Sequence, residues 1–448
     1  MEIKISELLE LVEQKRFIEL REILIQMNEV DISEFLETLE IEKIIVIFRM
    51  LPKEISAEVF ACFDSDTQEH IINSITDNEI TEIIEDLFVD DAVDIIEELP
   101  ASVVKRVLKN AHKDTRNLIN QFLMYDEQTA GSIMTAELID LKKYMTVEQS
   151  FDRIRRTAKD METIYTCYVT DGNKRLEGVT SIKTLLLSDP QSKIEEIMES
   201  DVISVTTTDD KEDVAIIFSK YGLLSLPVVD HENRLVGIVT VDDAVDVINE
   251  EATEDFEKMA AMSPSDKPYL KTSVFSLAKN RIMWLLILMI SAMVTGTVLQ
   301  KYEHAFAALP ILVTFIPMLT DTGGNAGSQS STLIIRGMAL SEVKISDIWK
   351  VLWKELRVSF LVGFVLSAVN YVRLLITYPG NEMVALTVAL SLFATVVIAK
   401  TIGCILPMVA KVFKADPAIM AAPIITTIVD AFALIFYFSV AQKLLNIA

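Results

Sequence analysis

The amino-acid sequence predicts a multidomain membrane protein. An all-α helical-repeat domain and an α/β domain come first, followed by a linker helix and a five-helix α transmembrane domain. Three observations support this: the first 130 residues contain no glycine, an internal repeat follows, and the last part of the chain carries five long apolar blocks. A chain of 448 residues has room for about three domains. The predicted parts are residues 1–130, 131–250, 251–278 (the linker) and 279–448.

The charge of the chain is divided unevenly along its length. Residues 1–270 hold 58 acidic and 27 basic residues, a net of −31, whereas residues 271–448 hold 8 acidic and 14 basic residues, a net of +6. A net of −31 has the wrong sign for binding a nucleic-acid backbone. The three cysteines and four histidines are scattered, so they predict neither a disulfide framework nor a zinc site. We find no nucleophile–base pair and no phosphate-binding loop, and we therefore predict no catalysis.

The N-terminal residues read as short amphipathic helices. Apolar residues recur at spacings of three and four, as in Ile80, Ile83, Ile84 and Leu87. Two Leu-Pro pairs, ending at Pro52 and Pro100, are expected near helix starts. The extreme N-terminus has no basic stretch followed by an apolar core, so we expect no cleaved signal and a cytoplasmic location for this half. An ordinary helical scaffold explains most of these residues.

Residues 131–250 contain two similar segments, 171–181 and 230–240, offset by 59 residues. Each has a β-rich run, a polar turn and a second β-rich run, with helical periodicity on both sides. Each module is small, so we expect the two modules to pack on each other. The pattern resembles a tandem pair of CBS domains, and the second copy carries the signature of that family at Gly237, Thr240 and Asp243.

The resemblance to CBS domains implies a nucleotide site in which Thr240 and Asp243 hold a ribose. The first copy departs from the pattern, because Ser181 is followed by Thr184 where the aspartate should be. At most one complete site, for example for ATP, is therefore expected. A purely structural or metal-sensing pair is an equally good interpretation.

Five apolar blocks follow, each long enough to cross a bilayer. They cover residues 282–300, 305–335, 356–378, 383–412 and 417–444. With the acidic half inside, ten basic residues flank the spans on the inner side, namely Lys271, Lys279, Arg281, Arg336, Lys344, Lys350, Lys354, Arg357, Lys411 and Lys414. Three flank them on the outer side, Lys301, Arg373 and Lys443. This asymmetry predicts a multi-pass cell-membrane protein with cytoplasmic N-terminal domains and an external C-terminus.

Asp430 lies in the middle of the last apolar block, and a carboxylate at that depth is a functional candidate. Pro423, Thr426 and Thr427 precede it by seven, four and three residues, and so lie on the same side of the helix. This stripe offers a carboxylate, two hydroxyls and backbone carbonyls. The structural alternatives are an ion pair with Lys400 or a permanently protonated side chain.

The second block interrupts its apolar sequence with Gly323, Gly324, Asn325, Gly327 and Gln329. Such a segment predicts either an unwound or a closely packed helix, in contact with protein or with a water-filled cavity. At the start of the last block, Asp416 precedes Pro417, which is typical of a helix N-terminus. Asp416 also lies about 21 Å below Asp430 along one helix, a distance that suits a cytoplasmic mouth.

The ligands along this path are oxygens. Without a thiolate or imidazole cluster, soft metals are disfavoured. Magnesium keeps several of its waters and needs few protein ligands. Pairing of two chains about a two-fold axis would bring two Asp430 carboxylates to one ion.

The chain resembles the MgtE family of magnesium channels along its length. Four features carry the resemblance: the segment 125–135, the CBS pair, the run Glu251-Ala-Thr-Glu254-Asp255, and the membrane motifs 322–329 and 416–430. It implies a homodimer with the pore between subunits, the ion site at Asp430, and a pore lining from the Gly324–Asn325 segment. It also implies that the glutamate-rich stretch after the CBS pair is a plug helix. The alternative interpretation of this stretch is a solvated linker helix. Cytosolic Mg²⁺ would close the pore by binding among Asp90, Asp91, Asp94, Asp243, Asp246, Glu251, Glu254, Asp255 and Asp416.

The sequence therefore predicts a homodimeric, magnesium-selective channel that closes when cytosolic magnesium is high. Two alternatives remain open at this point. One is a secondary transporter that couples a divalent cation to sodium or protons, and the other is a membrane-anchored magnesium sensor that does not conduct.

Overall fold

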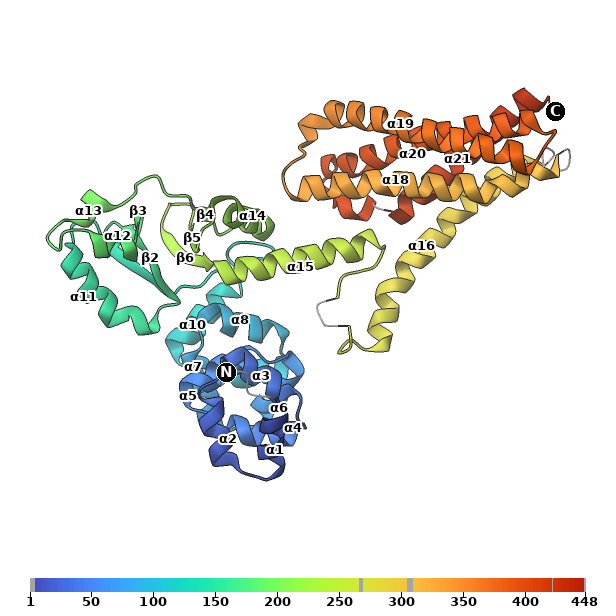
Figure 1. Ribbon diagram of the computed structural model, residues 1–448. Coiled ribbons are helices and arrows are strands. Elements are labelled where there is room, and N and C mark those ends of the chain that lie inside the picture. The colour runs from blue at the N-terminus through green and yellow to red at the C-terminus, as the bar shows by residue number, and fades with distance from the viewer. Residues whose placement is uncertain (1–4, 266–268, 304–308, 421, 447–448) are drawn as a thin grey trace. The chain divides into compact units, whose positions relative to one another are not determined.

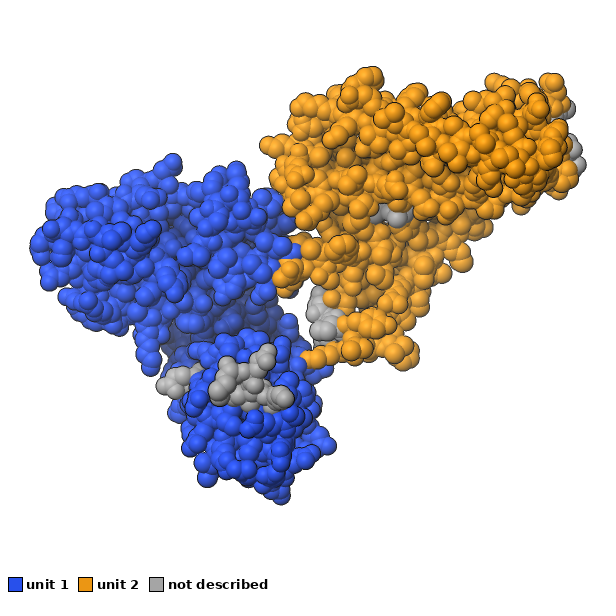
Figure 2. Space-filling view, viewed as in Figure 1, with its two compact units in different colours: residues 1–248 blue, residues 249–448 orange. Residues whose placement is uncertain are grey.

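The computed structural model describes residues 5–265, 269–303, 309–420 and 422–446. The chain forms two compact units, residues 1–248 and 249–448, which Figure 2 colours separately. Each unit is described by itself.

The first part of unit 1 is all-helical, as predicted (Figure 1). Its helices are α1 (Ile5–Glu13), α2 (Phe17–Leu24), α3 (Glu29–Glu37), α4 (Ile41–Phe48), α5 (Lys53–Ala61), α6 (Ser65–Ser74), α7 (Asp77–Asp86), α8 (Val89–Glu98), α9 (Ala101–Asn110) and α10 (Lys113–Phe122). Pro52 and Pro100 occupy the N-cap positions of α5 and α9, which confirms their expected place at helix starts. Helix α3 packs on α5, α5 on α7 and α7 on α9, so alternate helices build one continuous core.

The second part of unit 1 contains two three-stranded sheets with the same topology. The first module consists of β1 (Leu138–Lys142), α11 (Val147–Thr157), η1 (Ala158–Asp160), β2 (Thr163–Thr170), β3 (Leu176–Ser181), α12 (Ile182–Leu187) and α13 (Ile194–Ile197). The second consists of β4 (Val205–Thr206), α14 (Lys211–Tyr221), β5 (Ser225–Val229), β6 (Leu235–Thr240) and α15 (Val241–Met259). In both sheets the middle strand pairs in parallel with the first strand and antiparallel with the third. The predicted repeat is thereby confirmed.

The two modules pack on each other through equivalent positions. The Leu176 N–H donates to the carbonyl of Asn233 at 3.0 Å, and the Leu235 N–H donates to the carbonyl of Lys174 at 2.8 Å. Lys174 and Asn233, which are equivalent in the repeat, both have positive φ angles. The exchange of bonds is reciprocal, so the two modules are related by a local two-fold arrangement.

Unit 2 contains the end of α15 and a bundle of long helices (Figure 1). Its further elements are α16 (Val274–Lys301), η2 (Pro310–Phe315), α18 (Ile316–Ala339), η3 (Ile345–Asp347), α19 (Ile348–Thr377), α20 (Glu382–Val412), η4 (Pro417–Met420) and α21 (Ala422–Leu445). Helices α18, α20 and α21 pack closely on one another and α19 packs on α20. Val388, Val396 and Phe438 lie in the core of this bundle.

Within the described residues, four helical stretches are long and apolar enough to cross a membrane. They are Val274–Lys301, Ile345–Thr377, Glu382–Val412 and Pro417–Leu445. The other predicted span corresponds to α18, a helix of 24 residues whose mid-part carries Asp321, Asn325 and Gln329 and is therefore less apolar. The first residues of that predicted block, 305–308, lie outside the described residues. A bundle of five spans thus stays a prediction.

The glycine-rich part of the second block is a continuous, closely packed helix, and the alternative of an unwound segment is wrong. Residues 316–339 are helical throughout. A Cβ atom on Gly403 of α20 would lie only 2.2 Å from the carbonyl oxygen of Gly327 on α18, so the two backbones touch. Glycine at both positions permits a helix–helix approach that larger residues would prevent.

The glutamate-rich stretch is helical and continues β6 directly as α15. It ends at Met259, before Pro264, while Pro268 lies outside the described residues. Met259 packs against Ile335 of α18 and Ala418 of η4. The end of this helix is therefore packed against α18 and η4 of the same unit, unlike a fully solvated linker.

Candidate functional site

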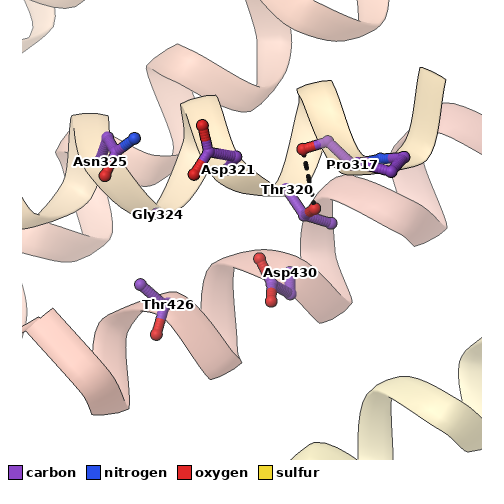
Figure 3. Close-up of a pocket in the computed structure, with 7 residues that line it drawn as sticks. All are labelled: Pro317, Thr320, Asp321, Gly324, Asn325, Thr426 and Asp430. Carbon is purple, nitrogen blue, oxygen red and sulfur yellow. Dashed lines mark hydrogen bonds between the residues drawn. The ribbon is translucent and has the colours of Figure 1, made fainter.

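A cavity of about 370 Å³ lies between α18 and α21 in unit 2 (Figure 3). Its lining consists of Pro317, Thr320, Asp321, Gly324 and Asn325 from α18, and Thr426 and Asp430 from α21. The structure thus brings together four residues predicted from the sequence, Asp430, Thr426, Asn325 and Gly324. Thr427, the fifth, is not among the residues that line this cavity.

Helical spacing places the polar groups of the cavity. Asp321 and Asn325 are four residues apart on α18, and Thr426 and Asp430 are four residues apart on α21, so each pair shares one face. Figure 3 shows the two pairs on opposite sides of the cavity. Gly324 allows this approach, because a Cβ atom there would lie 2.7 Å from Cγ2 of Thr426.

The hydroxyl groups of α21 direct their protons to the backbone. The Thr426 hydroxyl donates to the carbonyl oxygen of Pro423 at 2.9 Å, and the Thr427 hydroxyl donates to the same oxygen at 3.1 Å. Thr320 on α18 likewise donates to the carbonyl of Ile316 at 3.1 Å. A hydroxyl that has donated its proton presents its lone pairs, so Thr426 and Thr320 are acceptors toward the cavity.

Asp321 is a lining residue that the sequence reasoning did not select as a site. Its carboxylate is near enough to Asp430 for the two negative charges to repel each other. The spacing in the sequence could have identified it, because Asp321 precedes Asn325 by about one helical turn and so lies on the same face of α18. Two carboxylates facing one cavity favour a divalent cation more strongly than one carboxylate does.

The structural alternative for Asp430, an ion pair with Lys400, is not found in the described part of the chain. The ammonium group of Lys400 donates instead to the hydroxyl of Ser330 at 3.3 Å. The carboxylate of Asp430 therefore faces the cavity without an ion pair to any cationic side chain that the structure describes.

A second group of acids lies in unit 1, at the first turns of two helices. Asp90 and Asp91 open α8, and Asp242 and Asp243 open α15. Burial, and then the Asp243 carboxylate, raise the pKa of Asp90 well above its ordinary value and that of Asp91 to about 6. These carboxylates thus repel one another when they are ionised, and a divalent cation bound among them would relieve the repulsion.

Glu162, just before β2, belongs to the same group and was missed by the sequence reasoning. Burial, followed by repulsion from Asp242 and Asp243, raises its pKa to about 7. No local sequence motif identifies Glu162 or Asp242 as members of this group, because they approach Asp91 only in the folded unit. Two other predicted residues lie on these helices, Asp94 on α8 and Asp246 on α15.

A third group of acids surrounds the end of α15 in unit 2. The ammonium group of Lys258 contacts Glu254 and lies 2.6 Å from Oδ2 of Asp416. Burial, and then the Asp416 carboxylate, raise the pKa of Asp255. Asp416 also accepts the N–H of Ala418 at 2.8 Å, so it caps a helix start as expected, but that helix is the short 3-10 helix η4. Helix α21, which carries Asp430, begins only at Ala422, so the prediction that Asp416 and Asp430 lie on one helix is wrong. Glu251 lies on α15, one turn before Asp255.

The predicted regulatory residues thus lie in separate groups. Among the described residues, no three His, Cys, Asp or Glu side chains are arranged to hold a metal ion. Within each group the acids are close enough to interact electrostatically. They do not form a complete coordination shell for a metal ion among the described residues.

The predicted nucleotide residues make a local helix cap. The hydroxyl of Thr240 donates to Oδ2 of Asp243, and the Thr240 N–H approaches the same oxygen at 3.3 Å. In the first module, the Ser181 hydroxyl accepts the N–H of Thr184 at 3.0 Å. A hydroxyl therefore stands in the first copy where the second has a carboxylate, as the sequence comparison of the two copies indicated.

Comparison with known protein families matches three parts of the chain. Residues 316–440 match the MgtE model, described as a divalent cation transporter; residues 27–128 match the MgtE intracellular N domain; and residues 194–250 match the CBS domain. The CBS match thus covers the second module.

Two curated relatives cover most of the chain. The magnesium transporter MgtE of Thermus thermophilus is 36% identical over 431 residues, 95% of each chain. The magnesium transporter MgtE of Bacillus subtilis is 31% identical over 376 residues, 84% of this chain and 83% of its own. Among solved structures, the cytosolic domain of the Mg²⁺ channel MgtE in complex with ATP is 35% identical, with a TM-score of 0.52, and covers 55% of this chain and 100% of that chain. Both the sequence and the arrangement of domains lead to the same conclusion: this chain belongs to the MgtE family.

Proposed function

We propose that this protein is a homodimeric, Mg²⁺-selective channel of the cell membrane that mediates magnesium influx. One observation carries the proposal: Asp430 faces Asp321 and Asn325 across one cavity within a bundle of long apolar helices. A carboxylate inside such a bundle is costly and marks an ion path by default. The similarity to magnesium transporters over most of the chain supports the choice of ion.

The ligands of the cavity suit a hydrated magnesium ion. They are carboxylate, amide and hydroxyl oxygens, without a thiol or imidazole among the residues that line the cavity. Mg²⁺ dehydrates reluctantly and usually keeps several waters. A cavity of about 370 Å³ has room for an ion with a partial water shell, so few direct protein ligands are needed.

The exposed face of α18 supports a homodimer. Asp321, Asn325 and Gln329 follow one another at four-residue spacing, and all three are exposed in the single chain. Polar side chains at membrane depth face protein or water rather than lipid. A second copy packed on this face about a two-fold axis would enclose the path and bring two Asp430 carboxylates to it.

The acidic groups of the two units support closure by cytosolic Mg²⁺. The group in unit 1 contains Asp90, Asp91 and Asp243, and the group at the end of α15 contains Glu254, Asp255 and Asp416. Cations that bridge such carboxylates favour compact states, and loss of the cations favours separated ones. Mg²⁺ would thus shift a two-state equilibrium toward the closed pore by binding that state more tightly.

ATP is a proposed second ligand, at Thr240 and Asp243 of the CBS pair. One support is the relative whose cytosolic domain was solved with ATP. For the topology, the excess of basic residues on one side of the spans supports cytoplasmic N-terminal domains and an external C-terminus.

The proposal is tested by Mg²⁺ uptake into liposomes containing the purified full-length protein, without a sodium or pH gradient. The native chain should conduct, and Asp430→Asn should lower the initial rate at least tenfold. Asp347→Asn is the matched control, because that carboxylate lies on η3 and pairs with Lys350 at 2.7 Å. Uptake that requires a gradient would favour the coupled transporter, and no uptake by any variant would favour the non-conducting sensor.

Closure is tested separately by protease protection of the same preparation. Raising Mg²⁺ into the millimolar range should slow cleavage of the connecting segment around Tyr269, which is exposed. The Asp91→Asn, Asp243→Asn double variant should need more Mg²⁺ for the same protection. Unchanged cleavage across the magnesium range would contradict closure by bridging.

A further inference from the structure

Lys400 is a charged residue buried among the long helices of unit 2. Only 5% of its surface is exposed, and it lies on α20, the most buried of the apolar helices. A charged side chain at such a position requires compensation by a counter-charge and hydrogen bonds. Within the described residues, Lys400 forms no direct ion pair, and its polar contact is with Ser330 of α18.

Ser330 connects Lys400 to a carboxylate on a third helix. The ammonium group of Lys400 donates to the Ser330 hydroxyl at 3.3 Å, and that hydroxyl donates to Oε2 of Glu355 on α19 at 2.7 Å. Ser330 itself is 1% exposed. The hydroxyl is both acceptor and donor, so the three groups form one oriented chain from a positive to a negative charge.

We propose that Lys400, Ser330 and Glu355 form a serine-bridged ion pair that positions α18 for ion transport. The inference deepens the proposed function, because it assumes that ions pass between α18 and Asp430. The three are positioning residues: none of them lines the cavity.

The geometry of α18 explains how this pair can act on the path. Ser330 follows Asn325 by five residues, which is about 7.5 Å along the helix. Ser330 points into the bundle, whereas Asn325 and Asp321 are exposed on another face of the same helix. Helix α18 behaves as a rigid rod over this length, so a shift or rotation at Ser330 displaces Asn325 and Asp321 relative to Asp430.

The positive charge of Lys400 and the negative charge of Glu355 compensate each other through Ser330, so their effects on stability are coupled. Removing one partner of a buried pair leaves the other charge without compensation and is strongly destabilising, whereas replacing both by neutral groups is often tolerated. Lys400→Met and Glu355→Gln preserve approximate shape while removing charge. In the double variant, Ser330 retains a glutamine oxygen as its acceptor.

The test measures thermal unfolding and Mg²⁺ uptake for the full-length native protein, both single variants and the double variant. Glu355→Gln leaves the buried Lys400 charge without compensation and should lower the unfolding midpoint by on the order of 10 °C. Lys400→Met leaves a carboxylate that is only partly buried, so it should lower the midpoint by less. At a temperature where every variant is folded, each single variant should lower the maximal uptake rate about tenfold, and the double variant should return to within about threefold of the native rate. Lys411→Met is the matched control, since Lys411 is exposed on the same helix α20, and it should leave both quantities unchanged.

Three results would overturn the proposal: single variants that behave like the native protein, a double variant as impaired as the worse single one, or altered unfolding with native uptake. Ser330→Ala supplies an independent check, because it removes the bridge and keeps both charges, and it should impair uptake while Asp430 is intact. If Asp430→Asn conducts normally, the proposed function fails, but recovery of thermal stability in the double variant would still establish the pair.

Discussion

The ammonium group of Lys258, one residue before the end of α15, lies 2.6 Å from Oδ2 of Asp416 at the start of the last membrane segment. It also contacts Glu254 one turn earlier on its own helix. A lysine thus lies between two carboxylates that we propose as ligands of a regulatory magnesium ion. Burial lowers the pKa of Lys258, but the hydrogen bonds that its ammonium group donates to Asp416 and Glu254 outweigh this effect, and the net pKa is raised. The lysine remains charged and holds the end of α15 against Asp416, the residue that precedes η4.

Replacement of this lysine should loosen the end of α15. Phe256 lies on that part of the helix and is 72% exposed, but chymotrypsin can cut after it only when the helix opens. In Lys258→Met without Mg²⁺, we expect cleavage after Phe256 to be about 2- to 5-fold faster, because a partly exposed ion pair contributes ~0.5–1 kcal/mol. Lys159→Met, on η1 in unit 1, is the control and should cleave at the native rate. An unchanged rate for Lys258→Met would show that the ion pair does not hold the helix.

The acids of unit 1 should make stability depend on pH. Glu162 has a pKa raised to about 7 and Asp91 one raised to about 6, chiefly by burial, whereas both titrate near pH 4 in an unfolded chain. Between about pH 4 and pH 7 the folded protein binds more protons than the unfolded one, so the free energy of unfolding falls as the pH rises. The loss attributable to Glu162 is on the order of 1–2 kcal/mol once solvent screening is allowed for.

This pH dependence can be measured as the unfolding midpoint of unit 1 in the full-length protein, without Mg²⁺. Glu162→Gln should raise the midpoint at pH 8 and flatten its change between pH 5 and pH 8. Glu34→Gln, at an exposed position on α3, should leave the profile as it is. Added Mg²⁺ should flatten the native profile too, since a bound cation offsets the repulsion. A native profile that rises with pH over this interval would contradict the assignment.

Local patterns in the sequence predicted most of the fold. Pro52 and Pro100 indicated helix starts because proline is tolerated there and disfavoured in helix interiors. The repeat of residues 171–181 and 230–240 predicted two similar sheets, because each copy carries its own strand–turn–strand pattern. The sequence identified three residues of the cavity as candidate site residues, because polar side chains are rare inside long apolar blocks. These residues are Asp430, Thr426 and Asn325.

Other features depend on contacts between distant segments and could not be read from local patterns. Glu162 joins Asp91 and Asp243 only through the packing of unit 1, and nothing in its neighbourhood distinguishes it from a surface glutamate. The sequence allows an ion pair between Lys400 and Asp430, yet Lys400 points to Ser330, because the rotation of a helix determines which neighbour a side chain meets. Whether the glycine-rich segment was unwound or packed depended on its neighbours, and Gly403 of α20 provides the close contact.

Asp321 should contribute to ion passage although it lies outside the set selected from the sequence. It lines the same cavity as Asp430 and adds a second negative charge there. Asp321→Asn should lower the initial rate of Mg²⁺ uptake into liposomes about tenfold and raise the Mg²⁺ concentration needed for half-maximal rate. Glu342→Gln, at an exposed position outside the cavity lining, is its control. Native uptake by Asp321→Asn would show that the Asp321 carboxylate does not contribute to ion passage.

Gly324 should be required for the spacing of α18 and α21. A Cβ atom at this position would lie 2.7 Å from Cγ2 of Thr426, and a β-branched side chain on a helix has little freedom to turn away. Gly324→Ala should therefore push the two helices apart, lower the unfolding midpoint and reduce Mg²⁺ uptake several-fold. Overpacking of this kind typically costs ~1–3 kcal/mol.

The cause of that defect can be isolated with a second substitution. Thr426→Ser removes the methyl group that the new Cβ would strike and keeps the hydroxyl that lines the cavity. The Gly324→Ala, Thr426→Ser double variant should therefore recover most of the lost uptake. Gly296→Ala is the matched control, because nothing lies within 4 Å of a Cβ at that position on α16, and it should behave like the native protein or be slightly more stable. If the double variant stays as impaired as Gly324→Ala, the steric explanation is wrong, and glycine would be needed at 324 for a reason other than the contact with Thr426.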